Sequence, residues 1–328
     1  MRSLLNLVSP SGAKGRLSVL VLHRVLPEPD LMFADAMHAA RFVELCRWVR
    51  SMFQVLPLDE AVGRLQTGTL SARALAITFD DGYADNLEVA TPILRAHGLT
   101  ATVFVTTGML GDGCMWNDVV IESFRRTAVA EVDLRDVLGV AGGPFRLGSP
   151  ADRRHAAESV VNAIKYLATD QRTAMVAQVS DRTLVAPPVD LMLQPSQVIE
   201  LRRAGMQVGA HTVSHPILTR LSAPQARHEI GHSKAFLEDL LGERVGLFAY
   251  PNGKPGEDYD DACVAMVREL GFDAAVTTVR GAAMRTTDPF QIPRFTPWDR
   301  SRLRFGARMV STLWASRRGL TEATQAGY

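Results

Sequence analysis

Two short groups of polar residues in this 328-residue chain have the types and spacing of a metal site. Asp80 and Asp81 stand side by side and are followed by Gly82. His211 and His215 are four residues apart, in the sequence His-Thr-Val-Ser-His. Two imidazoles and one carboxylate around an open coordination position form a recurring catalytic zinc arrangement. One aspartate would complete the ligand set, and the other would remain available as a base.

Each group also has a simpler explanation. Asp-Asp-Gly can be an ordinary turn in which Gly82 permits a sharp change of direction, with Asp85 capping the helix that follows. The two histidines can be hydrogen-bonded loop residues without a metal. Two adjacent carboxylates at the end of a buried strand repel each other and resist desolvation, however, and a bound cation would compensate them. The predicted positions of the two groups therefore decide between these readings.

Strands and helices alternate along the chain. The apolar run Ala74–Phe79 directly before the aspartates predicts a strand that is buried on both faces. Other strands are predicted over residues 17–22, 54–56, 100–105, 206–210, 245–250, 274–278 and 291–295, and helices over 36–52, 58–65, 86–97, 196–204, 223–241 and 258–270. Few hairpin signals interrupt this order, so we expect an α/β fold with a mainly parallel sheet, closed or nearly closed into a (β/α) barrel.

The polar residues follow the predicted strands. In a barrel of this kind the active site lies at the carboxyl ends of the strands. The residues found there are His23, Asp80 and Asp81, Thr106 and Thr107, His211 and His215, Tyr250 to Asn252, and Arg294. Pro216 disfavours a helix at His215, so the histidines are expected on a loop after a strand. Both candidate groups are therefore predicted at the same rim.

The domain organisation follows from where this pattern changes. We expect one barrel domain over residues 1–299, with a helical insertion at 112–189 whose helices cover 122–127 and 151–179. Residues 300–328 are predicted to form a basic amphipathic tail. Such a helix can pack on the barrel or lie on an anionic membrane surface.

The composition limits the classes of partner and location. The net charge of +1 gives no support for nucleic acid as the main partner. The 3 cysteines are far apart and predict no disulfide framework and no cysteine-based zinc motif. The apolar runs near the N-terminus are too short for a secretory core or a membrane span. We expect a cytoplasmic protein, with the tail as a candidate for peripheral contact at the inner face of the membrane.

The order of three motifs resembles the polysaccharide deacetylases, the NodB-homology group that includes carbohydrate esterase family 4. These motifs are Thr-Phe-Asp-Asp-Gly-Tyr, His-Thr-Val-Ser-His and Ala-Tyr-Pro-Asn-Gly, and the likeness runs from about His23 to Phe295. The resemblance implies a distorted (β/α) barrel with about seven main strands. It also implies metal-dependent hydrolysis of N-acetyl groups from N-acetylhexosamine-containing poly- or oligosaccharide, with release of acetate.

The resemblance also implies roles for individual residues. Asp80 would be the general base, and the metal ligands would be Asp81, His211 and His215. The backbone N–H of Asn252 would help to hold the oxyanion. Zinc is the first choice of metal, but imidazole and carboxylate ligands also accept cobalt or nickel.

Two departures from the family pattern affect the expected mechanism. Ala249 stands where many members have an arginine that orients the base, and Arg294 is a candidate to replace it. No histidine follows His232, so the histidine that protonates the leaving amine in many members is missing. His23 is the leading candidate for that acid, or it only hydrogen-bonds in the groove. The His-Arg-Val ending at His23 resembles a branch associated with exopolysaccharide gene sets.

Aromatic residues near the motifs allow more than one interpretation. Tyr83, Trp116 and Tyr250 can stack on sugar rings or serve as packing residues, and Trp298 has the same ambiguity. Two other functions stay open at this point: a carbohydrate-binding relative that has lost turnover, supported by the two departures, and a hydrolase of another amide bond. The sequence names neither the glycan nor the oligomeric state.

Overall fold

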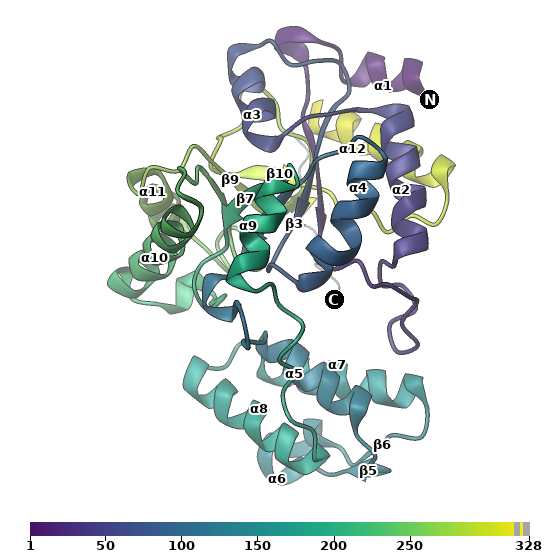
Figure 1. The fold of residues 1–328 in the computed structure, drawn as a ribbon, viewed down its shortest axis with the longest axis vertical. Coiled ribbons are helices and arrows are strands. Elements are labelled where there is room, and N and C mark those ends of the chain that lie inside the picture. Colours follow the sequence, from purple (N-terminus) through teal and green to yellow (C-terminus); the bar gives the residue numbers. More distant parts are fainter. Residues whose placement is uncertain (318–321, 324–328) are drawn as a thin grey trace. The chain divides into compact units, whose positions relative to one another are not determined.

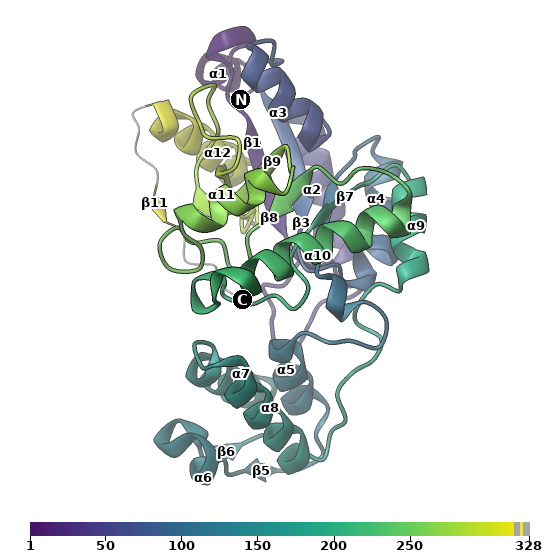
Figure 2. The same ribbon diagram turned by 90° about the vertical axis from the view of Figure 1, so that its left-hand side faces the viewer.

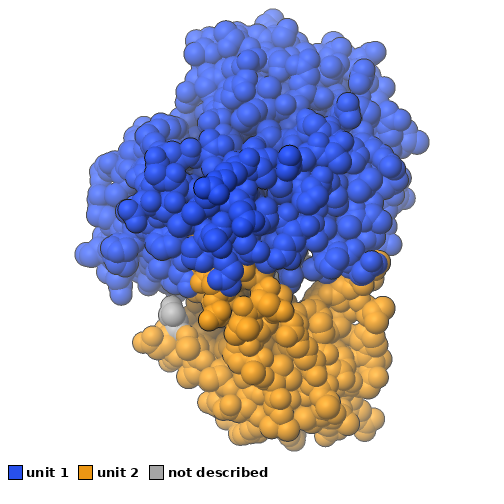
Figure 3. All heavy atoms as spheres, viewed as in Figure 1, with its two compact units in different colours: residues 1–28, 37–108, 193–328 blue, residues 29–36, 109–192 orange. Residues whose placement is uncertain are grey.

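The chain forms two compact units. The structure is a computed structural model and describes residues 1–317 and 322–323. Unit 1 comprises Met1–Glu28, Met37–Gly108 and Leu193–Tyr328, and unit 2 comprises Pro29–Ala36 and Met109–Met192 (Figure 3). Among the described residues, no helix combines the length and the apolar character needed to cross a membrane.

Unit 1 is built on seven parallel strands that form a nearly closed barrel (Figure 1). Their order is β1 (Ser18–Leu22), β3 (Ala74–Phe79), β4 (Thr102–Val105), β7 (Gln207–Ala210), β8 (Leu247–Ala249), β9 (Ala274–Arg280) and β10 (Ile292–Arg294). The two ends of the sheet meet because Phe295 N donates to Val19 O and Val21 N donates to Phe295 O. The prediction of a distorted barrel with about seven parallel strands is confirmed. Two short strands add to it: β2 (Gln54–Val55) on β3, and β11 (Glu322–Ala323), antiparallel, on β9.

Helices surround this barrel (Figures 1 and 2). They are α1 (Arg2–Val8), α2 (Ala39–Met52), α3 (Leu58–Thr67), α4 (Thr91–Ala96), α9 (Pro195–Arg203), α10 (Ala223–Leu241), α11 (Asp261–Glu269) and α12 (Arg302–Arg317). Helix α10 has the predicted bounds, since Ser222 forms a capping box at its start and Gly242 ends it with a φ of 65°. Helix α12 buries Phe305, Met309 and Leu313. Helix α1 is not predicted by the sequence pattern, because its apolar run is short.

Unit 2 has its own hydrophobic core. Its helices are α5 (Trp116–Arg126), α6 (Arg135–Leu138), α7 (Pro150–Ile164) and α8 (Thr169–Thr183), with a small antiparallel pair, β5 (Glu131–Val132) and β6 (Phe145–Arg146). Val120, Phe124 and Val160 are fully buried in this core. The sequence predicts an insertion over 112–189 and one helical stretch over 151–179. The structure divides that stretch into α7 and α8, and unit 2 also includes residues 29–36.

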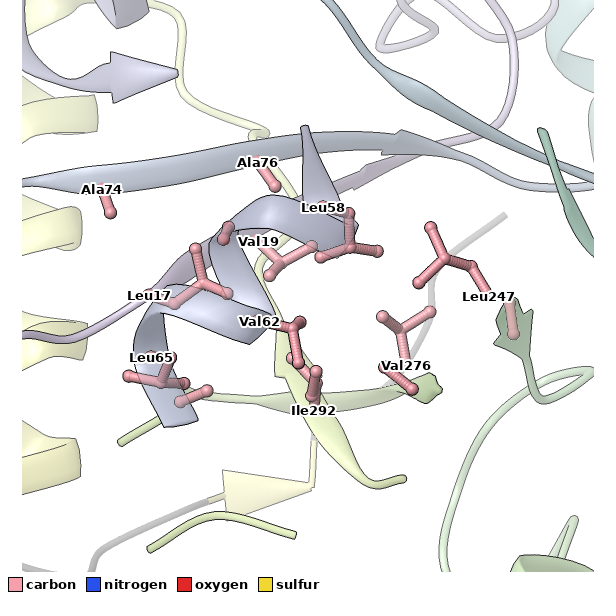
Figure 4. Close-up of a cluster of buried hydrophobic side chains, with 14 of the residues drawn as sticks. Leu17, Val19, Leu58, Val62, Leu65, Ala74, Ala76, Leu247, Val276 and Ile292 are labelled. Atoms are coloured by element: carbon pink, nitrogen blue, oxygen red, sulfur yellow. The ribbon is translucent and has the colours of Figure 1, made fainter. Parts of the chain in front are cut away.

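The barrel core explains the apolar runs in the sequence. Every residue of β1 and β3 is buried, as expected for parallel strands covered on both faces. Figure 4 shows side chains of these strands, including Val19 and Ala76, in one cluster with Val276 and Ile292. This core fixes the strand tips from which the polar residues extend.

The close approach of two core strands gives a stability prediction. A Cβ atom added at Gly209 on β7 would lie 2.5 Å from the ring of Phe104 on β4, which is fully buried. We expect Gly209→Ala to lower the free energy of unfolding by about 1–3 kcal/mol, measured by urea denaturation. The matched control is Gly63→Ala in α3, where nothing lies within 4 Å of the added atom. Equal stability of the two variants would contradict this account of the core.

Candidate metal centre

The two adjacent aspartates follow β3 and are both buried. Asp80 is 2% exposed and Asp81 is 5% exposed. Asp81 adopts a φ of 76° and Gly82 a φ of 85°, backbone conformations that cost a non-glycine residue free energy. The two carboxylates contact different partners: Asp80 pairs with Arg294, whereas Asp81 faces two histidines.

Arg294 at the end of β10 holds Asp80 in a bidentate ion pair. Its two terminal nitrogens donate to the two carboxylate oxygens of Asp80 over 2.7 and 2.6 Å. The guanidinium also donates to Thr277 O over 2.7 Å and to the Thr78 hydroxyl over 3.2 Å. Burial opposes ionisation of Asp80, but the charges of Arg294 and then His211 outweigh it and lower the pKa of this carboxyl. Asp80 is therefore an ionised, fixed carboxylate.

Asp81 and the two histidines converge on one point. Asp81 Oδ1 lies 3.4 Å from His211 Nε2 and 3.6 Å from His215 Nε2. The three candidate ligand atoms all lie within 4.8 Å of one another. The hydrogen-bond distance of 2.7 Å between His211 Nδ1 and Ala249 O assigns the proton to Nδ1, because a carbonyl can only accept. In the neutral ring, the lone pair of Nε2 then faces a carboxylate oxygen.

The electrostatics of these residues favour a cation. Asp81 Oδ1 is buried and has no hydrogen-bond partner among the described residues. Burial lowers the pKa of His215 to about 4, so this ring is neutral at pH 7. Burial also opposes a charge on His211, but Asp81 and Asp80 outweigh it and raise the pKa of His211. A divalent ion would satisfy Asp81 Oδ1 and both Nε2 atoms, so these residues fit the expected metal.

Backbone strain is concentrated around these residues. Of the six described non-glycine residues with a positive φ, four are Asp81, Thr212, His215 and Asn252. Such conformations persist only where the surrounding structure enforces them, and they cluster at functional sites. The loop after β4 holds Thr212 in its strained conformation, because Thr107 N donates to Thr212 O over 3.1 Å. The ligand geometry is therefore built into the backbone.

His23 and Asn252 are two other residues that the sequence predicts at this rim. His23 is exposed, and it lies close enough to Asp80, Asp81 and His215 to interact with them electrostatically. Asn252 accepts from the Thr278 hydroxyl through its carbonyl, whereas no acceptor for its N–H is found among the described residues. The predicted roles of His23 and Asn252 toward a substrate stay predictions.

Three expectations change in the structure. Asp85 does not cap the following helix: its carboxylate accepts from Arg24 Nε and Val25 N and so holds the loop after β1. Tyr250 is fully buried and stacked on Tyr259, with ring centroids 3.9 Å apart. Tyr83 is 3% exposed, and the Arg24 guanidinium covers its ring. Neither tyrosine presents a face to a sugar, so their predicted stacking role is wrong in this conformation.

Trp116, a predicted sugar contact, and Thr78, a residue that was not predicted, are the last two residues to place. Trp116 belongs to unit 2, where the Arg172 guanidinium lies 4.9 Å from its ring centroid, and its predicted sugar contact stays a prediction. Thr78 was not predicted as a site residue; its hydroxyl donates to Leu20 O and accepts from Arg294. A hydroxyl in an otherwise apolar buried strand was the available signal.

Comparisons with known proteins agree with this geometry. The family model described as polysaccharide deacetylase matches residues 67–138 and 143–275, more than half of the chain. YxkH of Bacillus subtilis, provisionally named a polysaccharide deacetylase, is 20% identical over 238 residues, which are 73% of this chain and 56% of YxkH. The chain thus spans little more than half the length of this relative. PdaC of the same organism, a peptidoglycan-N-acetylmuramic acid deacetylase, is 37% identical over 59 residues, 18% of this chain and 13% of PdaC.

Solved structures share the fold. The deacetylase PplD of Streptococcus pyogenes superposes with a TM-score of 0.58 at 19% identity, over 91% of this chain and 98% of that one. IcaB of Ammonifex degensii gives a TM-score of 0.58 at 18% identity, over 93% of this chain and 98% of that one. With the family model matching more than half of the chain and both principal motifs meeting at one rim, the chain belongs to the polysaccharide deacetylase family, whose members hydrolyse carbon–nitrogen bonds other than peptide bonds.

Proposed function

We propose that this protein is a metal-dependent deacetylase that releases acetate from N-acetylhexosamine-containing poly- or oligosaccharide. The proposal rests on one observation: the two adjacent acids have different partners. Asp81 converges with His211 and His215, and Asp80 is held outside that set by Arg294. A hydrolytic site needs both a ligand set and a separate base.

The proposed metal would be bound by Asp81, His211 and His215. Zinc suits this donor set, and cobalt or nickel would also be accepted. Such an ion supplies Lewis acidity toward the acyl oxygen and lowers the pKa of water. The unsatisfied Asp81 Oδ1 and the lone pair of His211 Nε2 support this assignment.

The protein's own residues would carry the proton transfers. Asp80, ionised and fixed by Arg294, accepts a proton from the water that attacks the acetamide carbon. The N–H of Asn252 donates to the developing oxyanion, and one such donor typically contributes roughly 3 kcal/mol to transition-state stabilisation. His23, exposed at the rim, gives a proton to the departing amine. The products are acetate and a free amino sugar.

The substrate class rests on family membership. The resemblance of the His-Arg-Val ending to one branch favours an exopolysaccharide substrate. Of the two other functions, carbohydrate binding without turnover is weakened by Arg294. This residue occupies the orienting role that Ala249 leaves open.

We predict that Asp80→Asn lowers acetate release by about 100- to 10,000-fold, because the amide cannot accept the proton. The measurement is acetate release from a panel of N-acetylated chitooligosaccharides, with zinc content determined in parallel. Zinc content should stay at the wild-type level, because Asp80 lies outside the ligand set.

Full activity of Asp80→Asn would refute the base assignment. A zinc-loaded wild-type protein that releases no acetate from any glycan of the panel would refute deacetylation. Turnover of a cyclic imide by that protein would then support the other amide hydrolase, and glycan binding without turnover would support the binding protein.

We predict that His23→Ala lowers kcat by about 100-fold. The reason is that the leaving amine loses its proton donor. The measurement is kcat with the best glycan of the panel. His97→Ala, on the loop after α4, is the control. An unchanged rate would remove His23 from the mechanism.

We also propose that the protein contacts an anionic membrane through α12 together with α1, which packs against it (Figure 2). Leu4, Leu7 and Leu303 are 54%, 69% and 77% exposed. Neither helix contains an acidic residue, and Arg302 and Arg304 are exposed. An apolar surface with basic residues suits anionic lipid. Residues 318–321 and 324–328 of the expected tail lie outside the described residues.

We predict that the protein co-sediments with vesicles of phosphatidylglycerol and phosphatidylcholine and not with phosphatidylcholine alone. The double change Leu4→Ser and Leu7→Ser should reduce the bound fraction several-fold, because it removes apolar area. Leu31→Ser, at a leucine of unit 2 that is 83% exposed, is the matched control. Equal partitioning of all three proteins would contradict the membrane contact.

A further inference from the structure

We infer that Glu229 is a positioning residue of the metal centre, because it holds the loop between the two histidine ligands in its binding conformation. The inference rests on the proposed function, since it requires that Asp81, His211 and His215 bind the ion. Glu229 lies near the start of α10, on a different element from every proposed ligand. It acts on the ion only through the loop.

The carboxylate of Glu229 accepts three hydrogen bonds from two consecutive loop residues. Val213 N and Ser214 N both donate to Oε2 over 2.8 Å. The Ser214 hydroxyl donates to Oε1 over 2.7 Å. All three donors lie between His211 and His215. Hydrogen bonds to an ionised acceptor are shorter and stronger than those between neutral groups, so this carboxylate is a firm anchor for the loop.

The loop needs such an anchor because its backbone is strained. Thr212 and His215 adopt φ values of 66° and 55°, which are unfavourable for residues with a Cβ. From the other side, Gly108 N donates to Val213 O over 2.8 Å. Glu229 therefore closes a clamp whose other half is the loop after β4. Without the carboxylate, two adjacent N–H groups lose their acceptor and the strained turn can relax.

A sequence motif at this place suggests a different role that the geometry does not support. Residues 228–232 read His-Glu-Ile-Gly-His, the pattern in which two helical histidines bind zinc and the glutamate is the base. His228 and His232 are exposed, with ring centroids 4.2 Å apart. The Glu229 carboxylate is instead occupied by the loop. We therefore assign Glu229 to the proposed metal centre and not to a second ion site at His228 and His232.

The histidine pair determines how the test is designed. Two imidazoles four residues apart on a helix can bind a divalent ion by themselves. Metal affinity is therefore measured in a parent variant that carries His228→Ala and His232→Ala, so that only the proposed centre is titrated. The readout is the Kd for zinc of the metal-free protein, determined by competition with a chromophoric chelator. The absorption spectrum of the cobalt form reports the ligand geometry.

Glu229→Ala should weaken zinc binding by about 10- to 100-fold, the usual effect of losing a group that orients metal ligands. It should also change the cobalt spectrum. Glu229→Gln should retain most of the affinity, because its amide oxygen can accept from both backbone N–H groups while its amide nitrogen donates to the Ser214 hydroxyl. Asp239→Ala, at an exposed acid of the same helix, should leave the Kd unchanged.

An unchanged Kd and cobalt spectrum in Glu229→Ala would overturn the inference. If that variant does not fold, Ser214→Ala replaces it: weaker zinc binding supports the clamp, and an unchanged Kd overturns it. A parent that binds no zinc overturns the proposed function and this inference together. A parent that binds zinc and releases acetate, with Glu229→Ala binding equally well, overturns only the role of Glu229.

Discussion

Two buried carboxylates next to each other in the chain must each be compensated by positive charge, and this requirement organises the whole site. Burying an ionised carboxylate is costly unless it is paired. Asp80 is paired with a bidentate arginine. Asp81 Oδ1 lies near two imidazole nitrogens and has no hydrogen-bond partner among the described residues. Asp80 is satisfied by the protein itself, whereas the proposed cation would satisfy Asp81.

The barrel meets this requirement by placing strand tips together. The aspartates follow β3, the histidines follow β7, and Arg294 ends β10. These strands are distant in sequence, but a closed parallel barrel directs all their carboxyl ends to one rim. Positive φ values at Asp81, Thr212 and His215 then aim the side chains. Strain at these positions is consistent with a site in which geometry was favoured over local backbone stability.

Much of this arrangement could be predicted from local sequence signals. Continuous apolar runs identified β3 and its neighbours, because strands buried on both faces lack alternation. Gly242 and Ser222 marked the ends of α10. The burial of Tyr83 and Tyr250 could not be predicted, since an aromatic residue beside a motif has the same sequence appearance in the core and at the surface. The roles of Thr78 and Glu229 depend on contacts between elements distant in sequence, which no local pattern reports.

The central claim is that one divalent ion is bound by Asp81, His211 and His215 and by no other part of the described rim. The most direct measurement is the anomalous difference density of zinc in a crystal of the zinc-treated protein, collected on both sides of the zinc absorption edge. The account predicts one peak at this rim, about 2.0–2.2 Å from Asp81 Oδ1 and both histidine Nε2 atoms. A fully zinc-loaded crystal with no peak between these three residues would contradict it.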